Sequence, residues 1–175
     1  MDCLKFGAEG AYGQFRKPYT TTSALTFLCI HPIAVKGLVG AVLGIDRSKL
    51  YESTSNMKVG IRVLSPVQKD LQSIKLLTMK PGDGGKAGLF NFPSNVEFLR
   101  NLKYELFIAW DVDKLDMLEA RLKNSTPIYT PCFGVTEHIA KLTFLDRCEA
   151  PAAQDETNVD SVVPIDLLGS IKFSD

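Results

Sequence analysis

Residues 32–63 read PIAVKGLVGAVLGIDRSKLYESTSNMKVGIRV and predict a helix followed by a strand. Apolar residues recur in the first part at the i, i+3, i+4, i+7 spacing of one helix face: Val35, Leu38, Val39 and Val42. Pro32 suits the first position of this helix, because a first helical residue needs no N–H. From Met57 to Val63 apolar positions alternate with basic or glycine positions, which is typical of a half-buried strand with a basic outer face.

Further strands and a second helix are predicted on either side of this unit. Residues 1–10 predict a first strand, residues 104–110 a core strand and residues 135–145 a last strand. A second amphipathic helix is marked by Leu115, Leu118 and Leu122, and its start by the potential capping residues Asp111 and Asp113.

A protruding hairpin is predicted over residues 71–93, because two extended segments flank the turn sequence PGDGGK at 81–86. The order of elements is then βαββαβ with this hairpin inserted. That order predicts an α+β, ferredoxin-like (RRM-like) fold, with an antiparallel sheet, two helices on one face and a thumb-like β-hairpin. We expect one domain over residues 1–148, followed by an acidic tail, residues 149–175, that packs on the domain or extends from it.

The charges of the chain balance in total but not along its length. Twenty Lys and Arg face twenty Asp and Glu, and a net charge of zero argues against a generic polyanion binder. Residues 1–103 nevertheless carry 14 basic and 7 acidic residues, whereas residues 104–175 carry 6 and 13. This asymmetry indicates either a basic half that meets an anionic partner or simply an acidic tail.

Targeting and metal-binding signals are absent from the sequence. No N-terminal stretch has the pattern of a signal peptide, and the apolar run 33–45 is too short to cross a membrane. The four cysteines show neither CxxC nor CxxH spacing, so neither a metal site nor a disulfide framework is predicted. We expect a cytoplasmic protein without cofactor or membrane contact.

Residues 19–27 (YTTTSALTF), Pro32 and residues 36–44 (KGLVGAVLG) together resemble the fifth family of CRISPR-associated proteins (Cas5). This family is a RAMP branch found in type I Cascade complexes. Phe6-Gly7 and residues 131–134 (PCFG) fit the same pattern, and the resemblance, which is to type I-B-like members, covers residues 1–148. The subtype stays open between types I-B and I-D and a transposon-associated complex.

The resemblance implies a prokaryotic, non-catalytic subunit that caps the 5′ handle of crRNA in a DNA-targeting, antiviral complex. Its partners would be crRNA, the Cascade backbone subunit and the large subunit, with target DNA met only through the assembled complex. The hairpin would be the thumb that contacts RNA or a neighbouring subunit, through Lys80, Lys86, Phe90 and Phe92.

The expected RNA site is the segment around the start of the first helix. A helix N-terminus suits phosphate, glycines allow close approach of a sugar–phosphate backbone, and hydroxyls and cations bind it. The candidates are Arg16, Lys17, Tyr19, Thr20, Thr21, Thr22, Lys36, Gly37 and Gly40. The competing interpretation is a threonine-rich loop and a glycine-rich helix that only pack against the sheet.

Two other functions compete with RNA capping. One is a metal-independent endoribonuclease that processes precursor crRNA, but the Lys-His pair implicated in one branch of the family is absent, since Ile30 precedes His31 and Glu137 precedes His138. We expect His31 at a helix start and His138 within a strand. The other is a scaffold of ferredoxin-like fold that binds only protein. The aromatic residues Tyr104, Phe107 and Trp110 are expected in the core rather than stacked on bases.

Overall fold

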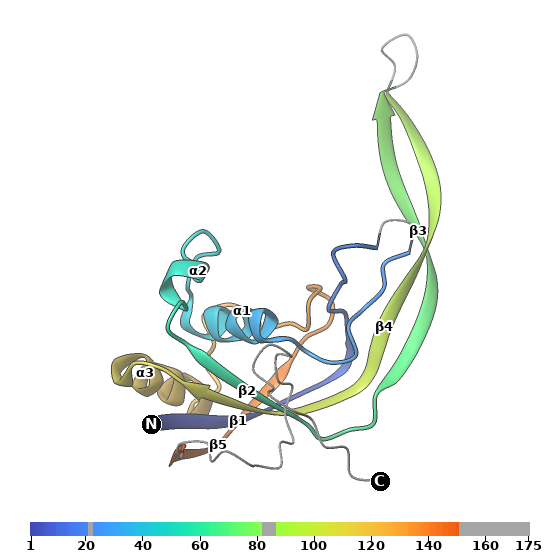
Figure 1. The fold of residues 1–175 in the computed structure, drawn as a ribbon. Helices are drawn as coiled ribbons and strands as arrows, with labels where there is room; N and C mark the ends of the chain where they lie inside the picture. The colour runs from blue at the N-terminus through green and yellow to red at the C-terminus, as the bar shows by residue number, and fades with distance from the viewer. Residues whose placement is uncertain (21–22, 82–86, 151–175) are drawn as a thin grey trace.

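The computed structural model describes residues 1–20, 23–81 and 87–150, with side chains described outside residues 77–92. Its elements, labelled in Figure 1, are β1 (Asp2–Gly13), α1 (Pro32–Leu43), α2 (Leu50–Ser53), β2 (Lys58–Val63), β3 (Gln68–Pro81), β4 (Ala87–Ala109), α3 (Val112–Lys123) and β5 (Lys141–Glu149). The predicted tail falls almost wholly on residues 151–175, which lie outside the described residues.

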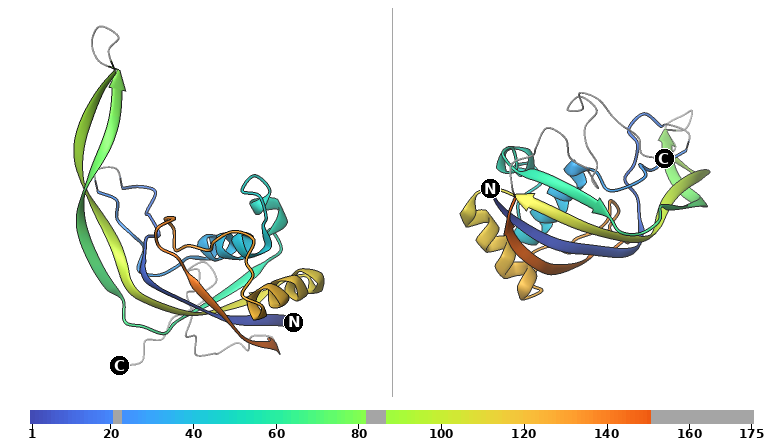
Figure 2. Two further views of the ribbon diagram at one scale, coloured as in Figure 1. Left: turned by 180° about the vertical axis from the view of Figure 1, so that it is seen from behind. Right: turned by 60° about the horizontal axis from the view of Figure 1, so that its bottom comes forward.

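An antiparallel sheet with the strand order β2-β4-β1-β5 forms the body, and β3 pairs with β4 outside this path. Its register places Phe6 of β1 between Leu106 of β4 and Phe144 of β5. The helices α1 and α3 lie on one face of the sheet (Figure 2). The α+β class and the antiparallel sheet predicted from the sequence are confirmed.

The core lies between this face of the sheet and the two long helices. Alternate residues of β1 point into it, and Leu4, Phe6 and Ala8 are fully buried. The predicted apolar faces of both helices are confirmed, because Val35, Leu38, Val39, Val42, Leu115, Leu118 and Leu122 are all buried. Tyr104 and Trp110 are also buried, as expected for core aromatics. The expectation was wrong for Phe107, which is only half-buried, because it points to the opposite face of β4 from Leu106 and Ile108.

The hairpin is longer than predicted. β3 pairs with β4 from Gln68 opposite Arg100 to Pro81 opposite Ala87, and the two strands rise from the body as a ribbon (Figure 1). The return strand does not stop before the core strand, because β4 runs through both as one strand of 23 residues. Asn101, with φ 52°, marks the irregular point between its two parts.

The last strand begins later than predicted. β5 spans Lys141–Glu149 rather than residues 135–145, because residues 133–140 form a turn. In this turn the Phe133 N–H donates to the His138 carbonyl (2.7 Å) and the His138 N–H donates to the Val135 carbonyl (3.1 Å). His138 therefore lies in a turn and not within a strand.

Asp111 starts α3 without capping it through its side chain. It occupies the N-cap position, but its carboxylate accepts no bond from the helix. Instead Oδ1 accepts a hydrogen bond from the Asn56 amide (2.9 Å), whose oxygen accepts one from the buried Trp110 indole (2.8 Å). The sequence pattern placed the helix correctly but could not show this competing partner.

Arg147 of β5 connects three elements through carboxylates. It donates to Asp2 of β1 and to Asp116 and Glu119 of α3. Hydrogen bonds from Arg147 lower the pKa of Asp2, and those from Lys123 and Arg147 lower the pKa of Glu119. Both carboxylates therefore stabilise the folded chain at pH values above their ordinary pKa, and this contribution is lost as the pH falls.

We expect Arg147→Met to remove part of this acid sensitivity. Without the guanidinium, the pKa values of Asp2 and Glu119 move toward their ordinary range, so unfolding stability should fall less steeply between about pH 5 and pH 3. Urea unfolding at a series of pH values measures this slope for the wild type and the variant. Parallel curves for the two proteins would contradict the assignment.

Candidate nucleic-acid interface

The loop that connects β1 to α1 (residues 14–31, of which 14–20 and 23–31 are described) lies between α1 and the hairpin in its described part (Figure 1). Two of its segments pair with each other, because the Phe27 N–H donates to the Phe15 carbonyl and the Lys17 N–H donates to the Leu25 carbonyl, both at 2.9 Å. The buried Phe15 and Thr26 side chains anchor this pairing, and the Thr26 hydroxyl accepts from the Phe15 N–H. The backbone of Arg16 and Lys17 is thus held in place.

The base of the hairpin holds the other side of the loop. The Ala24 N–H donates to the Asn95 carbonyl (3.0 Å), and the Glu97 N–H donates to the Ala24 carbonyl (2.9 Å). The Glu97 carboxylate accepts bonds from the Thr26 N–H (3.0 Å) and the Lys69 ammonium (2.9 Å). Partial burial opposes ionisation of Glu97, but these bonds outweigh it and lower its pKa. Sequence reasoning missed Glu97, since a lone carboxylate in a strand carries no motif.

The segment 131–134 fixes the start of the loop. The Gln14 N–H donates to the Phe133 carbonyl (2.9 Å), and the Phe133 side chain is fully buried. Gly134 has φ 90°, and a Cβ there would lie 1.7 Å from the Gln14 carbonyl oxygen. Only glycine fits this close approach, so the PCFG sequence positions the loop.

Arg16 and Tyr19 are the groups that the fixed loop leaves available. Arg16 is exposed, and within residues 1–20, 23–81 and 87–150 its guanidinium has no hydrogen-bond or ion-pair partner. Tyr19 is 72% exposed. Lys17 lies over the Phe27 ring at 5.9 Å, and the Thr20 hydroxyl donates to the Lys17 carbonyl (2.9 Å). The predicted Thr21 and Thr22 lie outside the described residues.

The start of α1 offers less to a phosphate than the sequence suggests. His31 is the N-cap, and its Nδ1 accepts from the Ala34 N–H (3.3 Å), which also donates to the His31 carbonyl (2.9 Å). The Val35 N–H donates to the same carbonyl, and Pro32 has no N–H. Only the Ile33 N–H is left among the first helical residues. The expected position of His31 at a helix start is confirmed.

Of the three α1 residues predicted to contact RNA, one is accessible and two interact with other parts of the chain. A Cβ at Gly37 would meet nothing within 4 Å, so a ligand can approach the backbone there. A Cβ at Gly40 would lie 2.6 Å from Leu50, so this glycine accommodates α2 rather than RNA. The Lys36 ammonium donates to the Thr54 carbonyl (2.6 Å), where it binds the C-terminal end of α2. The structure thus gives Gly40 a packing role and Lys36 a partner within the chain, and a contact of either with RNA stays a prediction.

Alanine substitutions should distinguish the two glycines. Gly37→Ala is expected to stabilise the fold by about 1 kcal/mol, because alanine is the better helix former and the added methyl meets nothing. Gly40→Ala should gain less or lose stability, because Leu50 must move. Urea unfolding of both variants measures the difference. An equal gain in both would show that Leu50 does not confine the helix.

For the four residues predicted on the thumb, the structure describes the backbone at most. Lys80, Phe90 and Phe92 belong to the paired strands, opposite Gly88, Thr78 and Leu76, but their side chains lie outside the described part of the chain. Lys86 lies outside the described residues altogether. Their contacts stay a prediction.

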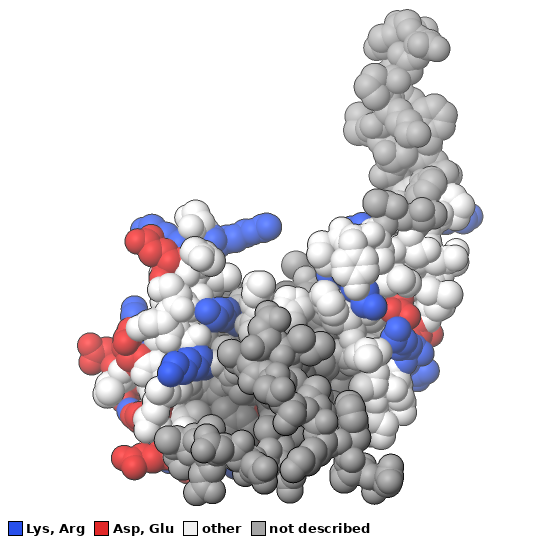
Figure 3. Space-filling view, viewed as in Figure 1, with Lys and Arg blue, Asp and Glu red and all other residues white. Residues whose placement is uncertain are grey.

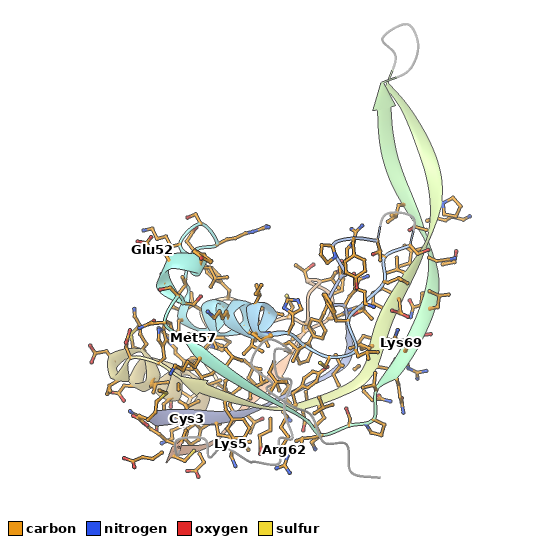
Figure 4. The ribbon with its side chains drawn as sticks, in the orientation of Figure 1. Cys3, Lys5, Glu52, Met57, Arg62 and Lys69 are labelled. Carbon is orange, nitrogen blue, oxygen red and sulfur yellow. The ribbon has the colours of Figure 1, made fainter. Side chains whose placement is uncertain are left out.

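The face of the sheet opposite the helices carries paired charges. Glu105 meets Lys5 at 3.5 Å and Arg62 at 3.7 Å, and Lys103 meets Glu9 at 3.1 Å. Lys5 and Arg62 lie on the side of the sheet away from α1 (Figure 4). Lys5 and Arg62 share one carboxylate and Lys103 faces another, so the positive charge of this surface is partly neutralised and its attraction for a polyanion is reduced.

Positive charge also lies on the helix side of the molecule. On the face in view, basic side chains lie over α2 and at the base of the hairpin, and acidic ones lie beside both and toward the α3 end (Figure 3). At the hairpin base Lys69 pairs with Glu97 at 2.9 Å. The fixed loop with Arg16 and Tyr19 lies between the two basic regions. Geometry and charge therefore favour this side for an extended anionic ligand.

The sequence of residues 3–169 matches the family described as CRISPR-associated protein (Cas_Cas5). The chain belongs to the Cas5 family. No curated protein matches this Cas5 chain.

Solved structures share the fold of this Cas5 chain at low sequence identity. One from a "CRISPR RNA-guided surveillance complex" has a TM-score of 0.61 and 13% identity, over 77% of this chain and 58% of that one. A "CRISPR-associated Protein" has a TM-score of 0.51 and 14% identity, over 83% and 69%. A functionally uncharacterized Streptococcus mutans protein has a TM-score of 0.52 and 10% identity, over 83% and 69%. The chain thus covers little more than half of the first of these.

Within this Cas5 chain the two histidines have different surroundings. The His31 ring contacts Phe15 and Phe27, and burial lowers its pKa. The His138 ring stacks on Tyr12 and meets Phe98 edge-on, and burial lowers its pKa. Its buried Nδ1 has no hydrogen-bond partner in the part of the chain that the structure describes. Both environments favour a neutral imidazole. This second aromatic cluster had no sequence signal, because its members come from three separate segments.

Two features are absent from the described residues, 1–20, 23–81 and 87–150. None of the helices there has the length and apolar character needed to cross a membrane. The same part of the chain contains no cluster of three or more His, Cys, Asp or Glu side chains arranged to hold a metal ion.

Proposed function

We propose that this Cas5 chain is a non-catalytic crRNA-binding subunit of a type I Cascade complex, in which it caps the 5′ handle. The observation that carries the proposal is the fixed loop of residues 14–31. It presents Arg16, which has no hydrogen-bond or ion-pair partner among the described residues, and an exposed Tyr19 on the side of the molecule where Gly37 leaves the α1 backbone open. A cation, an aromatic ring and an accessible backbone are what a single RNA strand requires.

The strand order supports a ferredoxin-like arrangement. With the hairpin set aside, β1, α1, β2, β4, α3 and β5 follow one another as βαββαβ, and the order β2-β4-β1-β5 puts the first and third of these strands in the centre. RNA-recognition motifs of this type bind RNA on the open sheet face. Here the paired charges of that face favour binding by the loop and helix side.

The remaining partners follow from the same proposal. The β3–β4 hairpin serves as the thumb and contacts the backbone subunit and the bound RNA, since it projects from the body (Figure 1). Another surface meets the large subunit, and target DNA is reached through the assembled complex. Because neighbouring subunits also bind the RNA, this chain does not require a large positive net charge of its own.

The complex purified with this chain should contain RNA of one defined 5′ sequence. Sequencing that RNA tests the proposal, which expects repeat-derived 5′ ends. A complex that assembles fully without RNA would instead support the protein-only scaffold.

We expect no cleavage of precursor RNA by the chain. His31, the histidine beside the candidate loop, uses Nδ1 to cap α1, and its neutral ring contacts two phenylalanines. Incubation of the purified protein with repeat RNA in EDTA should leave the RNA intact. A defined product that His31→Ala abolishes would establish the endoribonuclease alternative.

A further inference from the structure

A groove of about 720 Å³ lies between the C-terminal end of α3, the connection after it and the first half of β5. Its floor is apolar, with the buried Leu122 beside the half-buried Leu142 and Phe144. Its rim is basic and is formed by Arg121, Lys123 and Lys141. The groove is therefore suited to an occupant that is both apolar and acidic.

The groove adjoins an open edge of the sheet. Within the described residues β5 pairs with β1 alone, and it forms the end of the strand order β2-β4-β1-β5 (Figure 2). The outward backbone groups of an edge strand can bond to an added extended segment. A strand laid along β5 would place alternate side chains toward Leu142 and Phe144 in the groove.

We propose that residues 159–173 of the same chain lie along the β5 edge and fill this groove. The segment reads VDSVVPIDLLGSIKF, and Val163, Ile165 and Leu167 share one face if it is extended. Pro164 fits such a position, because an edge strand tolerates a residue without an N–H. The segment therefore has the alternating apolar residues that the floor requires.

The charges of the two parts are complementary. Residues 159–173 contain the acidic Asp160 and Asp166 and one lysine, Lys172, and three further acids, Asp155, Glu156 and Asp175, flank the segment. On the rim, Lys141 has no ion pair within the described residues, and the Arg121 guanidinium donates only to the Thr126 carbonyl (3.2 Å). Lys123 lies 4.6 Å from the Phe144 ring and pairs with Glu119. At least two cations of the rim, Lys141 and Arg121, can therefore pair with an acidic segment.

The covalent connection is long enough for this docking. β5 ends at Glu149, and the nine residues 150–158 can span up to about 30 Å, which equals the length of the nine-residue strand. The chain can therefore turn back along the edge that it has just left. Attachment through a short linker also raises the effective concentration of the segment at the groove to the millimolar range.

Hydrogen–deuterium exchange of the full chain tests the proposal. Amides of residues 162–168, and those of β5 that do not bond to β1, should exchange at least about tenfold more slowly than unstructured amides. Ile139→Glu with Lys141→Glu places two acids at the groove and should abolish this protection. Leu167→Asp with Leu168→Asp, which changes the docked segment instead of the groove, should also abolish this protection. The variant with all four substitutions should exchange no faster than either double variant.

A matched control uses the opposite edge of the sheet. Val63→Glu with Lys58→Glu changes one exposed apolar residue and one lysine of β2 and should leave the protection intact. Wild-type residues 162–168 that exchange as an unstructured peptide would overturn the proposal. Protection that grows with protein concentration, together with a dimer in sedimentation, would also overturn it, because the occupant would then be a second copy. The test requires no RNA, so its result is independent of the proposed function.

Discussion

Gly134→Ala is expected to destabilise the chain by about 4 kcal/mol, because backbone strain and overpacking each cost about 1–3 kcal/mol. The residue has φ 90°, where an L side chain is strained, and its Cβ would lie 1.7 Å from the Gln14 carbonyl oxygen. Neither backbone can yield easily, since the Gln14 N–H is bonded to the Phe133 carbonyl and Phe133 is buried. Urea unfolding measures the loss.

Gly7→Ala provides the matched control for this prediction. A Cβ at Gly7 on β1 would meet its nearest neighbours at 3.9 Å, which is ordinary contact, so this variant should unfold nearly as the wild type does. If Gly134→Ala retains the stability of Gly7→Ala, then the turn of residues 133–140 does not hold the loop in the way described. RNA loading of Gly134→Ala at low temperature should fall as well, because Gln14 begins the loop.

Arg16→Glu with Lys17→Glu is expected to reduce RNA loading of the complex by about a hundredfold or more, since hydrogen bonds to charged groups contribute about 1.5–3 kcal/mol each. The effect should arise from lost phosphate contacts and added repulsion, and not from unfolding. Within the described residues Arg16 makes no side-chain hydrogen bond or ion pair, and Lys17 has a ring contact at 5.9 Å and a weak electrostatic interaction with Glu97. The copurified RNA per complex measures the effect.

Lys58→Glu with Lys114→Glu controls for the change in net charge. Both lysines lie at the other end of the body from the loop, in β2 and α3, and neither has an ion pair within the described ranges. This variant should load RNA as the wild type does. Equal losses in the two double variants would mean that total charge, rather than the loop, determines loading.

Regular elements could be predicted wherever one periodicity governed the sequence. The apolar faces of residues 32–44 and 115–122 and the alternation of residues 57–63 produced two helices and a strand at the expected places. Prediction failed where tertiary contacts decided the outcome. Residues 135–140 have enough apolar character for a strand, yet Gly134 and the bonds to Gln14 turn them into a loop.

The location of the RNA site stays a prediction, but the structure shows which of the predicted residues are accessible. Of the basic, hydroxyl and glycine residues around the start of the helix, it leaves Arg16, Tyr19 and Gly37 accessible. Gly40 and Lys36 carried the same sequence signal, but both contact the region of α2, a short helix without a periodic pattern of its own. The carboxylate of Glu97 lies 71 residues from its backbone partner, so no local pattern could reveal it.

In the proposed function, the loop between β1 and α1 holds the 5′ end of the RNA. Ultraviolet cross-linking of the RNA-loaded complex, followed by mass spectrometry of the peptides and sequencing of the attached nucleotides, tests it most directly. We predict cross-links from 5′-handle nucleotides to the peptide that contains Tyr19, which is 72% exposed. Cross-links of those nucleotides confined to the opposite sheet face, around Lys5 and Arg62, would contradict the account.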